Sequence, residues 1–480
     1  MPRVRGLELP RFESRCRSAR ALGVTDLVVF PSERPLMGSV PVPGDKSIAH
    51  RAILFAGLTE GRCEVRGGTL GADNLSTLAA LQAMGVQVDK PDDSPDTLVI
   101  SGVGLDGLKA PSQPIDCGNS GTTMRLLCGV LAAQRFRTTL VGDASLSRRP
   151  MERVARPLRQ RGARIEGRLD PRRVGEITAP LEIGPLPKPH VLSTLEYEMP
   201  IASAQVKSAI LLSGLWSDGS TYVREPQVSR DHTERFLLAL GVPLETIGPM
   251  IQLDGATFSG KLPPFSITVP GDPSSAAFLI AAAIMIPNSR VTVRRVGTNP
   301  TRTGLYEVLR DMGASIAIEP HGEELGEPVG HLHAMGSNIS GGRLGGELVA
   351  RAIDEVPILC ALAARAKGIT TIEDATELRV KESDRIATMA RVLRAFGVNC
   401  EERPDGMIVE GIPDKPLQRA EVSSEGDHRI AMASAVLSLC ADGPCRVRDV
   451  DNIGTSFPRF VGTLRALGAR VDVEQSRGAA

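Results

Sequence analysis

The chain has 480 residues, enough for two or more domains, and its 42% hydrophobic and 23% charged residues are typical of a globular protein. Its 56 basic residues equal its 56 acidic residues, so no overall charge favours nucleic acid or an acidic membrane surface as a partner. The eight cysteines are scattered without the spacing of metal ligands, which predicts reduced thiols, a cytoplasmic location and no metal site.

The N-terminal stretch, residues 1–30, is rich in arginine and lacks the apolar core of a secretory signal. We expect it to be a flexible extension. No charge-free apolar run approaches the length of about 18 residues that a membrane span needs, so we expect no membrane partner.

The first apolar helix is expected directly after VPGD, in KSIAHRAILFAGL, where Lys46 and Ser47 open the helix. The free N-terminus of a helix offers unpaired amides and a positive dipole end, which favour phosphate or carboxylate. Arg51 lies about one turn further on the same face. The GxxxxGK[ST] pattern of an ATP-binding loop is absent, and for KSxxxR alone a solvated helix start remains the alternative.

The pattern L-x-x-x-G, followed by a short β-type stretch, occurs six times at nearly constant intervals along the chain. In each copy an amphipathic helix is expected to end, the glycine to take the left-handed position, and a strand to follow. The glycines are Gly85, Gly162, Gly241, Gly313, Gly397 and Gly468. The pattern predicts six units of similar length, each with two helices and several strands.

VPGD occurs twice, first at Val42 and again at Val269, and each copy precedes a helix of small apolar residues. The stretch between the two copies corresponds to three units, so the chain is expected to be a duplication of two similar halves. We predict one domain at 43–270 and a second formed by 31–42 together with 271–480.

Further helix starts along the chain carry cationic or amide side chains, in GNSGTTMR, GDASLSRRP, SAQVKSA, LRVKESDR and EGDHRIAM. They come from both halves. If the halves face each other, these helix ends converge on one cleft, and a neutral protein can hold a strongly cationic pocket. The expected substrates therefore carry several negative charges.

These stretches, together with RDHTE, NPTRTG, DEVPIL and TSFP in the same order, resemble the 5-enolpyruvylshikimate-3-phosphate synthase family over residues 38–472. The resemblance implies an α/β (α+β) protein with two domains of three βαβαββ units each. This is the inverse α/β barrel of the enolpyruvyl transferase fold, with a cleft between the domains. It also implies that the enolpyruvyl group of phosphoenolpyruvate passes to the 5-hydroxyl of shikimate 3-phosphate through a tetrahedral ketal, without cofactor.

The resemblance assigns two sets of binding residues. Those for phosphoenolpyruvate are Lys46, Gly121, Arg149, Gln205, Arg385 and Arg429. Those for shikimate 3-phosphate are Lys46, Ser47, Arg51, Ser203, Ala204, Gln205, Arg230, Asp354 and Lys381.

The same resemblance makes Asp354 the base on the 5-hydroxyl and Glu382 the proton donor to the methylene carbon, assisted by Lys46. Considered alone, Asp354 could instead cap the helix that follows it, and Glu382 could be an ordinary first-turn glutamate. An acid working near pH 7 needs a raised pKa, which burial would supply and neighbouring cations would oppose. The sequence leaves that balance open.

Two positions bear on how this chain compares with its family. Many members have a lysine where Thr455 stands, so one cation contact to phosphoenolpyruvate is missing or supplied elsewhere. Gly121 is retained where some glyphosate-tolerant members have alanine, although the chain is otherwise nearer that divergent, class II-like branch. We therefore expect intermediate glyphosate sensitivity.

Two alternatives remain. The sister enzyme that acts on UDP-N-acetylglucosamine shares the fold, but typically carries a cysteine in the loop that reads GDASLSRRP here. An inactive binding homologue is disfavoured by the complete set of charged residues. We expect a monomer that binds two small molecules, and domain closure about hinges near Gly44 and Gly271.

Overall fold

The computed structural model describes residues 24–67, 71–92, 94 and 96–476. Its strands form six four-stranded sheets. In each sheet one edge strand runs parallel to its neighbour, and the remaining pairs are antiparallel. Each sheet belongs to a unit built as strand, helix, strand, helix and two strands, so the predicted six-fold repeat is confirmed.

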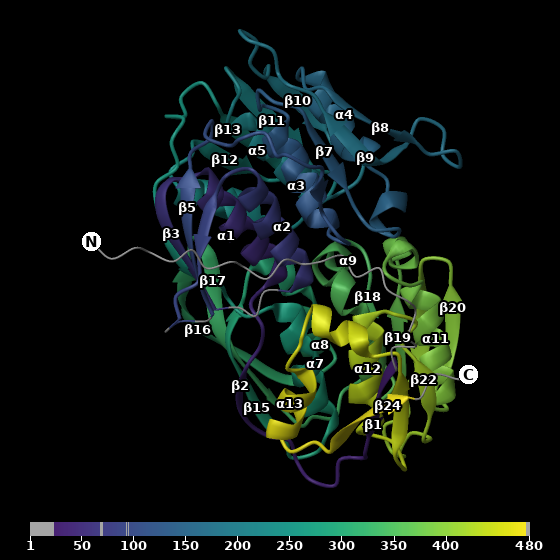
Figure 1. Cartoon of the computed structure of the whole chain (residues 1–480). Helices are drawn as coiled ribbons and strands as arrows, with labels where there is room; N and C mark the ends of the chain where they lie inside the picture. Colours follow the sequence, from purple (N-terminus) through teal and green to yellow (C-terminus); the bar gives the residue numbers. More distant parts are fainter. Residues whose placement is uncertain (1–23, 68–70, 93, 95, 477–480) are drawn as a thin grey trace.

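Three units form the upper part of Figure 1. The first comprises β14 (Ser266–Thr268), α1 (Lys46–Leu58), β3 (Glu60–Arg66), α2 (Ala72–Ala83), β4 (Gln87–Asp89) and β5 (Thr97–Val103). The second comprises β6 (Ile115–Asp116), α3 (Gly121–Leu131), β7 (Thr138–Val141), the 3-10 turn η1 (Leu146–Arg148), α4 (Glu152–Gln160), β8 (Ile165–Leu169) and β9 (Ile177–Ile183). The third comprises β10 (Leu195–Glu198), α5 (Ala204–Gly214), β11 (Ser220–Arg224), α6 (His232–Ala239), β12 (Leu244–Ile247) and β13 (Met250–Asp254).

The other three units form the lower part. The fourth comprises β2 (Met37–Pro41), α7 (Pro273–Met285), β15 (Arg290–Gly297), η2 (Pro300–Arg302), α8 (Gly304–Asp311), β16 (Ser315–Glu324) and β17 (Glu327–Met335). The fifth comprises β18 (Arg343–Leu344), α9 (Glu347–Ala352), η3 (Ile353–Glu355), α10 (Val356–Ala363), β19 (Ile369–Ile372), η4 (Thr376–Val380), α11 (Arg385–Ala395), β20 (Asn399–Arg403) and β21 (Gly406–Glu410). The sixth comprises β22 (Glu421–Ser423), α12 (His428–Ser438), β23 (Cys445–Arg448), η5 (Asp451–Thr455), α13 (Phe460–Ala466), β24 (Val471–Ser476) and β1 (Val24–Val29).

The two halves exchange their leading strands. β2 precedes α1 in the chain but pairs in parallel with β15, in the lower half. β14 precedes α7 but pairs in parallel with β3, in the upper half. Each VPGD therefore marks a point where the chain crosses from one half to the other, and Figure 1 shows β2 in purple among the green elements below.

The prediction of a flexible extension through residue 30 is wrong for its last part. β1 lies in the middle of the sixth sheet, between β23 and β24, and pairs with both. The C-terminal segment of the sixth unit contains only three strands, β22, β23 and β24. The N-terminal strand β1 is the fourth strand of their sheet. Residues 1–23 lie outside the described part of the chain.

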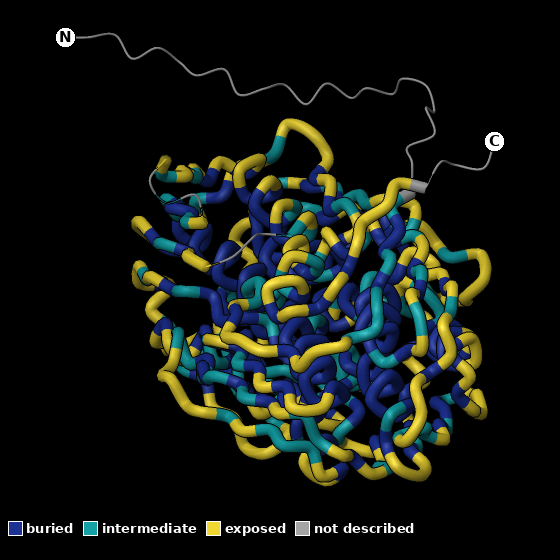
Figure 2. Tube along the Cα trace, turned by 90° about the horizontal axis from the view of Figure 1, so that it is seen from below, coloured by how far each residue is buried: buried dark blue, intermediate teal, exposed yellow. Residues whose placement is uncertain are grey.

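Each half has its own hydrophobic core. One core gathers residues between Ile48 and Val269, and the other gathers Leu27, Val29, Leu36 and Val40 with residues from Ala276 to Val471. The helices of small apolar residues lie inside: α1, α3 and α5 pack together in one half, and α7, α10 and α12 in the other. Figure 2 shows this buried interior in dark blue under exposed loops. We propose that these cores are the two domains, divided at 42/43 and 270/271.

The six repeat glycines occupy the backbone position that the sequence pattern predicts. All six have positive φ, between 77° and 106°. Each follows the second helix of its unit and precedes a strand. A side chain at such a position meets its own backbone, so glycine is the residue that turns the chain there without strain.

Candidate active site

The two VPGD turns pair with each other where the chain crosses between the halves. The amide of Asp45 donates to the carbonyl of Pro270 at 2.7 Å, and the amide of Asp272 donates to the carbonyl of Pro43 at 2.8 Å. The central glycines of the two motifs form an antiparallel bridge. The repeated motif is therefore explained by the crossing, because both copies are needed to make this one junction.

The two turns differ in what they present. Asp45 accepts hydrogen bonds from two amides of the first turn of α1, at 2.7 and 2.9 Å, and Asp272 caps α7 in the same way at 3.0 Å. α1 begins with Lys46, whose side chain is 42% exposed and forms an ion pair with Asp73. α7 begins with Pro273, which has neither a charge nor an amide donor. Of these two turns, the first therefore offers a cation to an anion, whereas the second does not.

Arg51 points into the first half rather than out of the helix end. Its Nε donates to the Thr233 hydroxyl at 2.7 Å, and its two terminal nitrogens donate to the Ser208 hydroxyl at 2.7 Å and the Ser47 carbonyl at 3.0 Å. These bonds use three of its five N–H donors. Arg51 itself is buried, with 3% of its surface exposed.

Gln205 joins the N-terminal ends of α3 and α5. Its amide nitrogen donates to the Thr122 hydroxyl at 2.8 Å, and its carbonyl oxygen accepts from Arg125 at 2.7 Å. Ser203 caps α5, and Ala204 is the first residue of that helix. The predicted helix start in SAQVKSA is therefore confirmed, and its polar side chains lie beside those of GNSGTTMR.

Arg125, on the predicted helix start GNSGTTMR, is a site residue that the family resemblance assigned to neither substrate. A Cβ atom added to Gly121 would lie 2.8 Å from one terminal nitrogen of Arg125 and 3.1 Å from one of Arg149. Arg149 in turn donates to Asn119 at 2.6 Å. Two guanidinium groups therefore flank the bare helix start at Gly121. The signal available in the sequence was an arginine inside an otherwise apolar helix, one turn after the glycine.

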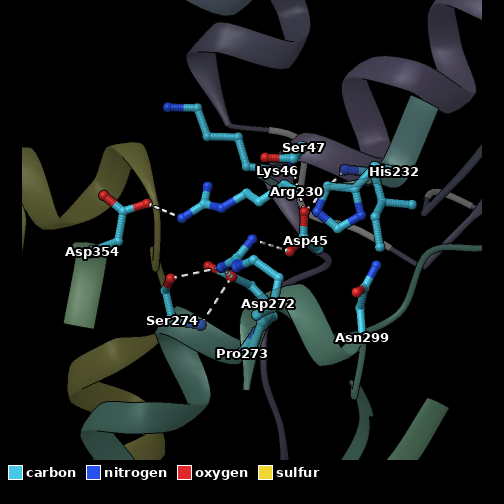
Figure 3. A network of polar contacts seen from close by, with 12 residues as sticks. Asp45, Lys46, Ser47, Arg230, His232, Asp272, Pro273, Ser274, Asn299 and Asp354 are labelled. Carbon is cyan, nitrogen blue, oxygen red and sulfur yellow. Dashed lines mark hydrogen bonds and ion pairs between the residues drawn. The ribbon is translucent and has the colours of Figure 1, made fainter. Parts of the chain in front are cut away.

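Three arginines surround Asp354, which lies in the 3-10 turn η3 of the second half. Arg429 donates to its main-chain carbonyl at 3.0 Å, and Arg385 lies 3.5 Å from its carboxylate. Arg230, from the first half, reaches across to the same carboxylate at 2.5 Å, as Figure 3 shows. The carboxylate of Asp354 therefore binds arginines from both halves. The alternative, that Asp354 only caps the following helix, does not explain this.

Glu382 lies next to this cluster. Its carboxylate is 2.5 Å from a terminal nitrogen of Arg385, whose Nε donates to Asp427 at 2.8 Å. Lys381 is oriented toward Glu377, with 3.7 Å between the charged atoms. The buried Arg385 is thus shared by three carboxylates, and Glu382, with 39% of its side chain exposed, is the most accessible of them.

The cations decide the ionisation of both carboxylates. Burial alone would raise the pKa of Asp354, but the surrounding cations, led by Arg429 and Arg230, hold it well below its usual range. Burial likewise acts to raise the pKa of Glu382, but nearby cations, chiefly Arg385, lower the pKa of Glu382 to about 2. The balance that the sequence left open therefore favours the ionised form in the ligand-free protein.

Thr455 lies at the junction between the halves. Its hydroxyl donates to the carbonyl of Asn452 at 2.7 Å. Its own carbonyl oxygen would be 2.6 Å from a Cβ atom on Gly71, so the end of η5 contacts the start of α2 closely. Thr455 thus approaches the first half through its main-chain carbonyl, and its side chain is neutral.

A family model described as EPSP synthase (3-phosphoshikimate 1-carboxyvinyltransferase) matches residues 31–464. The chain belongs to the EPSP synthase family. A curated relative from Acidithiobacillus ferrooxidans, named 3-phosphoshikimate 1-carboxyvinyltransferase, is 49% identical over 450 residues, which cover 94% of this chain and 99% of the relative. A relative of the same name from Geobacter sulfurreducens is 48% identical over 437 residues, covering 91% and 98%.

Solved structures agree with this membership. The EPSP synthase of Acinetobacter baumannii superposes with a TM-score of 0.85 at 42% identity, covering 94% of this chain and all of that one. The enolpyruvyl transferase NikO of Streptomyces tendae, at 16% identity and a TM-score of 0.72, shares the fold. The EPSP synthase family member described here therefore has the predicted enolpyruvyl transferase fold.

Two further observations concern ligands and location. Within the described ranges, no group of three or more His, Cys, Asp or Glu side chains is placed to hold a metal ion. Among the described helices, none is both long and apolar enough to cross a membrane.

Proposed function

We propose that the protein transfers the enolpyruvyl group of phosphoenolpyruvate to the 5-hydroxyl of shikimate 3-phosphate, releasing inorganic phosphate. This is the reaction of the shikimate pathway that its family performs on the way to aromatic amino acids. We also propose that it works as a cytoplasmic monomer on these two small molecules without a cofactor.

One observation carries the proposal: guanidinium groups from both halves converge on Asp354 and its neighbour Glu382 at the junction. Two substrates that bring a phosphate and a carboxylate each need several fixed cations, and arginine binds both groups with its planar fork. The two carboxylates among them supply groups that can accept and donate protons. An inactive binding homologue would need the cations but not this pair of acids.

Each substrate is assigned residues from both halves. For phosphoenolpyruvate we propose Lys46, Gly121, Arg149, Gln205, Arg385 and Arg429, with Arg125 added because it flanks Gly121. For shikimate 3-phosphate we propose Lys46, Ser47, Arg51, Ser203, Ala204, Gln205, Arg230, Asp354 and Lys381. Holding both substrates between the halves converts a bimolecular reaction into one between fixed partners.

In the addition step the 5-hydroxyl oxygen bonds to C2 of phosphoenolpyruvate, and C3 becomes a methyl group. Asp354 takes the hydroxyl proton, while Glu382, assisted by Lys46, gives a proton to C3. In the elimination step the bond from C2 to the phosphate oxygen breaks, a proton leaves the methyl group, and inorganic phosphate departs. The cations bind the departing phosphate, which lowers the barrier to its release.

The lowered pKa values are compatible with this chemistry if the substrates compete for the arginines. In the ligand-free protein Arg230 and Arg385 bind the carboxylates of Asp354 and Glu382. Substrate phosphates and carboxylates would draw these guanidinium groups away and bring negative charge. Both changes raise the pKa of the two acids.

The test is phosphate release from phosphoenolpyruvate with shikimate 3-phosphate, with UDP-N-acetylglucosamine, or with no acceptor. We expect release only with shikimate 3-phosphate. In Glu382→Gln it should fall at least about 100-fold, the usual contribution of a general acid. Glu401→Gln is the matched control, because Glu401 lies on the exposed strand β20 with 65% of its side chain accessible.

Release with UDP-N-acetylglucosamine instead would reassign the acceptor to the sister reaction. No release with either acceptor would leave only binding, and the proposed activity would be refuted.

A further inference from the structure

Arg302 is a buried arginine at the crossing between the two halves. It is the last residue of η2, within the stretch NPTRTG, and only 3% of its side chain is exposed. The proposed function gives it no contact with either substrate. Its hydrogen bonds to Asp45 and Asp272, one in each VPGD turn, nevertheless connect it to groups on both sides of the reaction.

Its guanidinium is shared among partners from different parts of the chain. One terminal nitrogen donates to the Asp45 carboxylate at 3.0 Å. The other donates to the Ser274 hydroxyl at 2.8 Å and to Asp272 at 3.3 Å, and lies 3.9 Å from Glu355. The hydroxyl of Ser274 in turn donates to Glu355. One arginine thus joins the caps of α1 and α7 to the end of η3.

Two of these partners stand next to groups that the proposed reaction needs. Asp45 caps α1 and immediately precedes Lys46, which opens the helix. Glu355 immediately follows Asp354, in the same 3-10 turn. In Figure 3 the side chains of Lys46 and Arg230 extend toward the side on which Asp354 lies. Moving Arg302 therefore moves a binding group of one half relative to the base of the other.

The electrostatics make this connection hard to replace. Three carboxylates within 4 Å of one guanidinium would repel one another without it. Burial acts to raise the pKa of Asp45, but Arg302, together with His232, the Ile48 amide and Arg230, lowers the pKa overall. Burial raises the pKa of Glu355, even with Arg302 beside it. The planar fork of arginine can hold several carboxylates at fixed angles, which the point charge of lysine cannot.

We propose that Arg302 is a positioning residue for the transfer reaction: it sets the start of α1, with Lys46, against the turn that carries Asp354. The inference rests on the proposed function of these two residues. A shift between them matters most in the transition state, where both act at once, so kcat should fall more than the KM values rise. Misplacement by about 1 Å can cost on the order of 100-fold in rate.

The kinetic test compares wild type with Arg302→Lys and Arg302→Gln. We expect Arg302→Lys to lower kcat by about 10- to 100-fold with both KM values within about threefold, and Arg302→Gln to lower kcat further. Arg294→Lys is the matched control, because Arg294 lies in the same unit on β15 but is exposed and donates to the Ser39 carbonyl at 2.9 Å. Unchanged kcat in Arg302→Lys, or equal loss in the control, would overturn the inference.

A second measurement needs no activity. Hydrogen exchange followed by mass spectrometry should show faster exchange in Arg302→Lys over residues 44–50 and 353–358, the two segments that Arg302 connects. Exchange over α4, far along the first half, should equal that of wild type and of Arg294→Lys. Unchanged exchange at both segments would also overturn the inference.

The outcomes separate the two proposals. A wild type without turnover, but with the exchange change in Arg302→Lys, would refute the proposed function while the coupling of the two turns stands. If Arg302→Lys fails to fold, Asp45→Asn replaces it, since asparagine still caps a helix but pairs weakly with Arg302. Asp45→Asn should then show the same loss of kcat with nearly constant KM, and unchanged kcat would again overturn the inference.

Discussion

Replacing Gly121 with alanine should weaken phosphoenolpyruvate binding through its two neighbouring arginines. The new Cβ atom would lie 2.8 Å from Arg125 and 3.1 Å from Arg149. Ordinary contacts of this kind begin near 3.4 Å, so Arg125 must retreat by about 0.6 Å and Arg149 by about 0.3 Å. Neither is free to do so without cost, because Gln205 and Asn119 accept hydrogen bonds from them at 2.7 and 2.6 Å.

The magnitude follows from the bonds that the shift weakens. A hydrogen bond from a charged donor contributes about 1.5–3 kcal/mol, and weakening one or two such bonds by up to half removes about 1–1.5 kcal/mol. The KM for phosphoenolpyruvate should therefore rise about 5- to 10-fold. The KM for shikimate 3-phosphate should rise less, since of its proposed ligands only Gln205 bonds to a displaced arginine.

The assay is initial-rate phosphate release with each substrate varied in turn, and with glyphosate as inhibitor. Gly462→Ala is the control, because a Cβ atom there meets nothing within 4 Å. Wild type should show intermediate glyphosate inhibition, and the inhibition constant should rise in Gly121→Ala. An unchanged KM for phosphoenolpyruvate together with an unchanged inhibition constant would refute the steric reasoning at this site.

Three further predictions concern ionisation, turns and the N-terminal strand. Because Glu382 has its pKa lowered to about 2, its ionised form stabilises the fold above the unfolded-state pKa near 4.3, and this contribution disappears as pH falls toward about 2. Melting temperatures of Glu382→Gln should therefore depend less on pH over that window than those of wild type, and parallel curves would contradict the assignment. Gly241→Ala should cost about 1 kcal/mol for its positive φ of 77° alone. Gly397→Ala, at a φ of 78°, should cost more, because its Cβ would also lie 2.7 Å from the Gln418 side chain. Urea unfolding of the pair checks this, and equal costs would show that the side chain yields freely. Deleting residues 1–30 removes β1 from the middle of a sheet and should abolish cooperative unfolding of the second core, whereas a variant that melts like wild type would show that β1 is dispensable.

The repeat, the duplication and the helix starts could be predicted from the sequence because their causes are local. Glycine is the residue that takes a positive φ at the end of a helix with least strain, so six spaced glycines predict six similar units. Ser203 caps α5 through the next turn of its own helix, and such a helix start depends only on nearby residues.

Strand partners and side-chain directions could not be predicted in this way. β1 pairs with β23 and β24, which lie near the opposite end of the chain, whereas the sequence alone predicted a flexible extension there. Arg51 was predicted to share the ligand-facing side of the helix start, but it donates hydrogen bonds to Thr233 and Ser208 of the third unit. Such contacts depend on which segments of the chain meet, and no local pattern of residue types encodes that.

By itself, the sequence determined the six-unit architecture, the duplicated turn and, through its motifs, the set of charged residues around the reaction. The tertiary structure alone decided that Asp354 and Glu382 are ionised in the ligand-free protein and that Arg302 ties the two turns together. The physical reason is that backbone conformation responds to neighbours within a few residues. Burial and the field of surrounding charges respond to everything within about 10 Å, whatever its place in the chain.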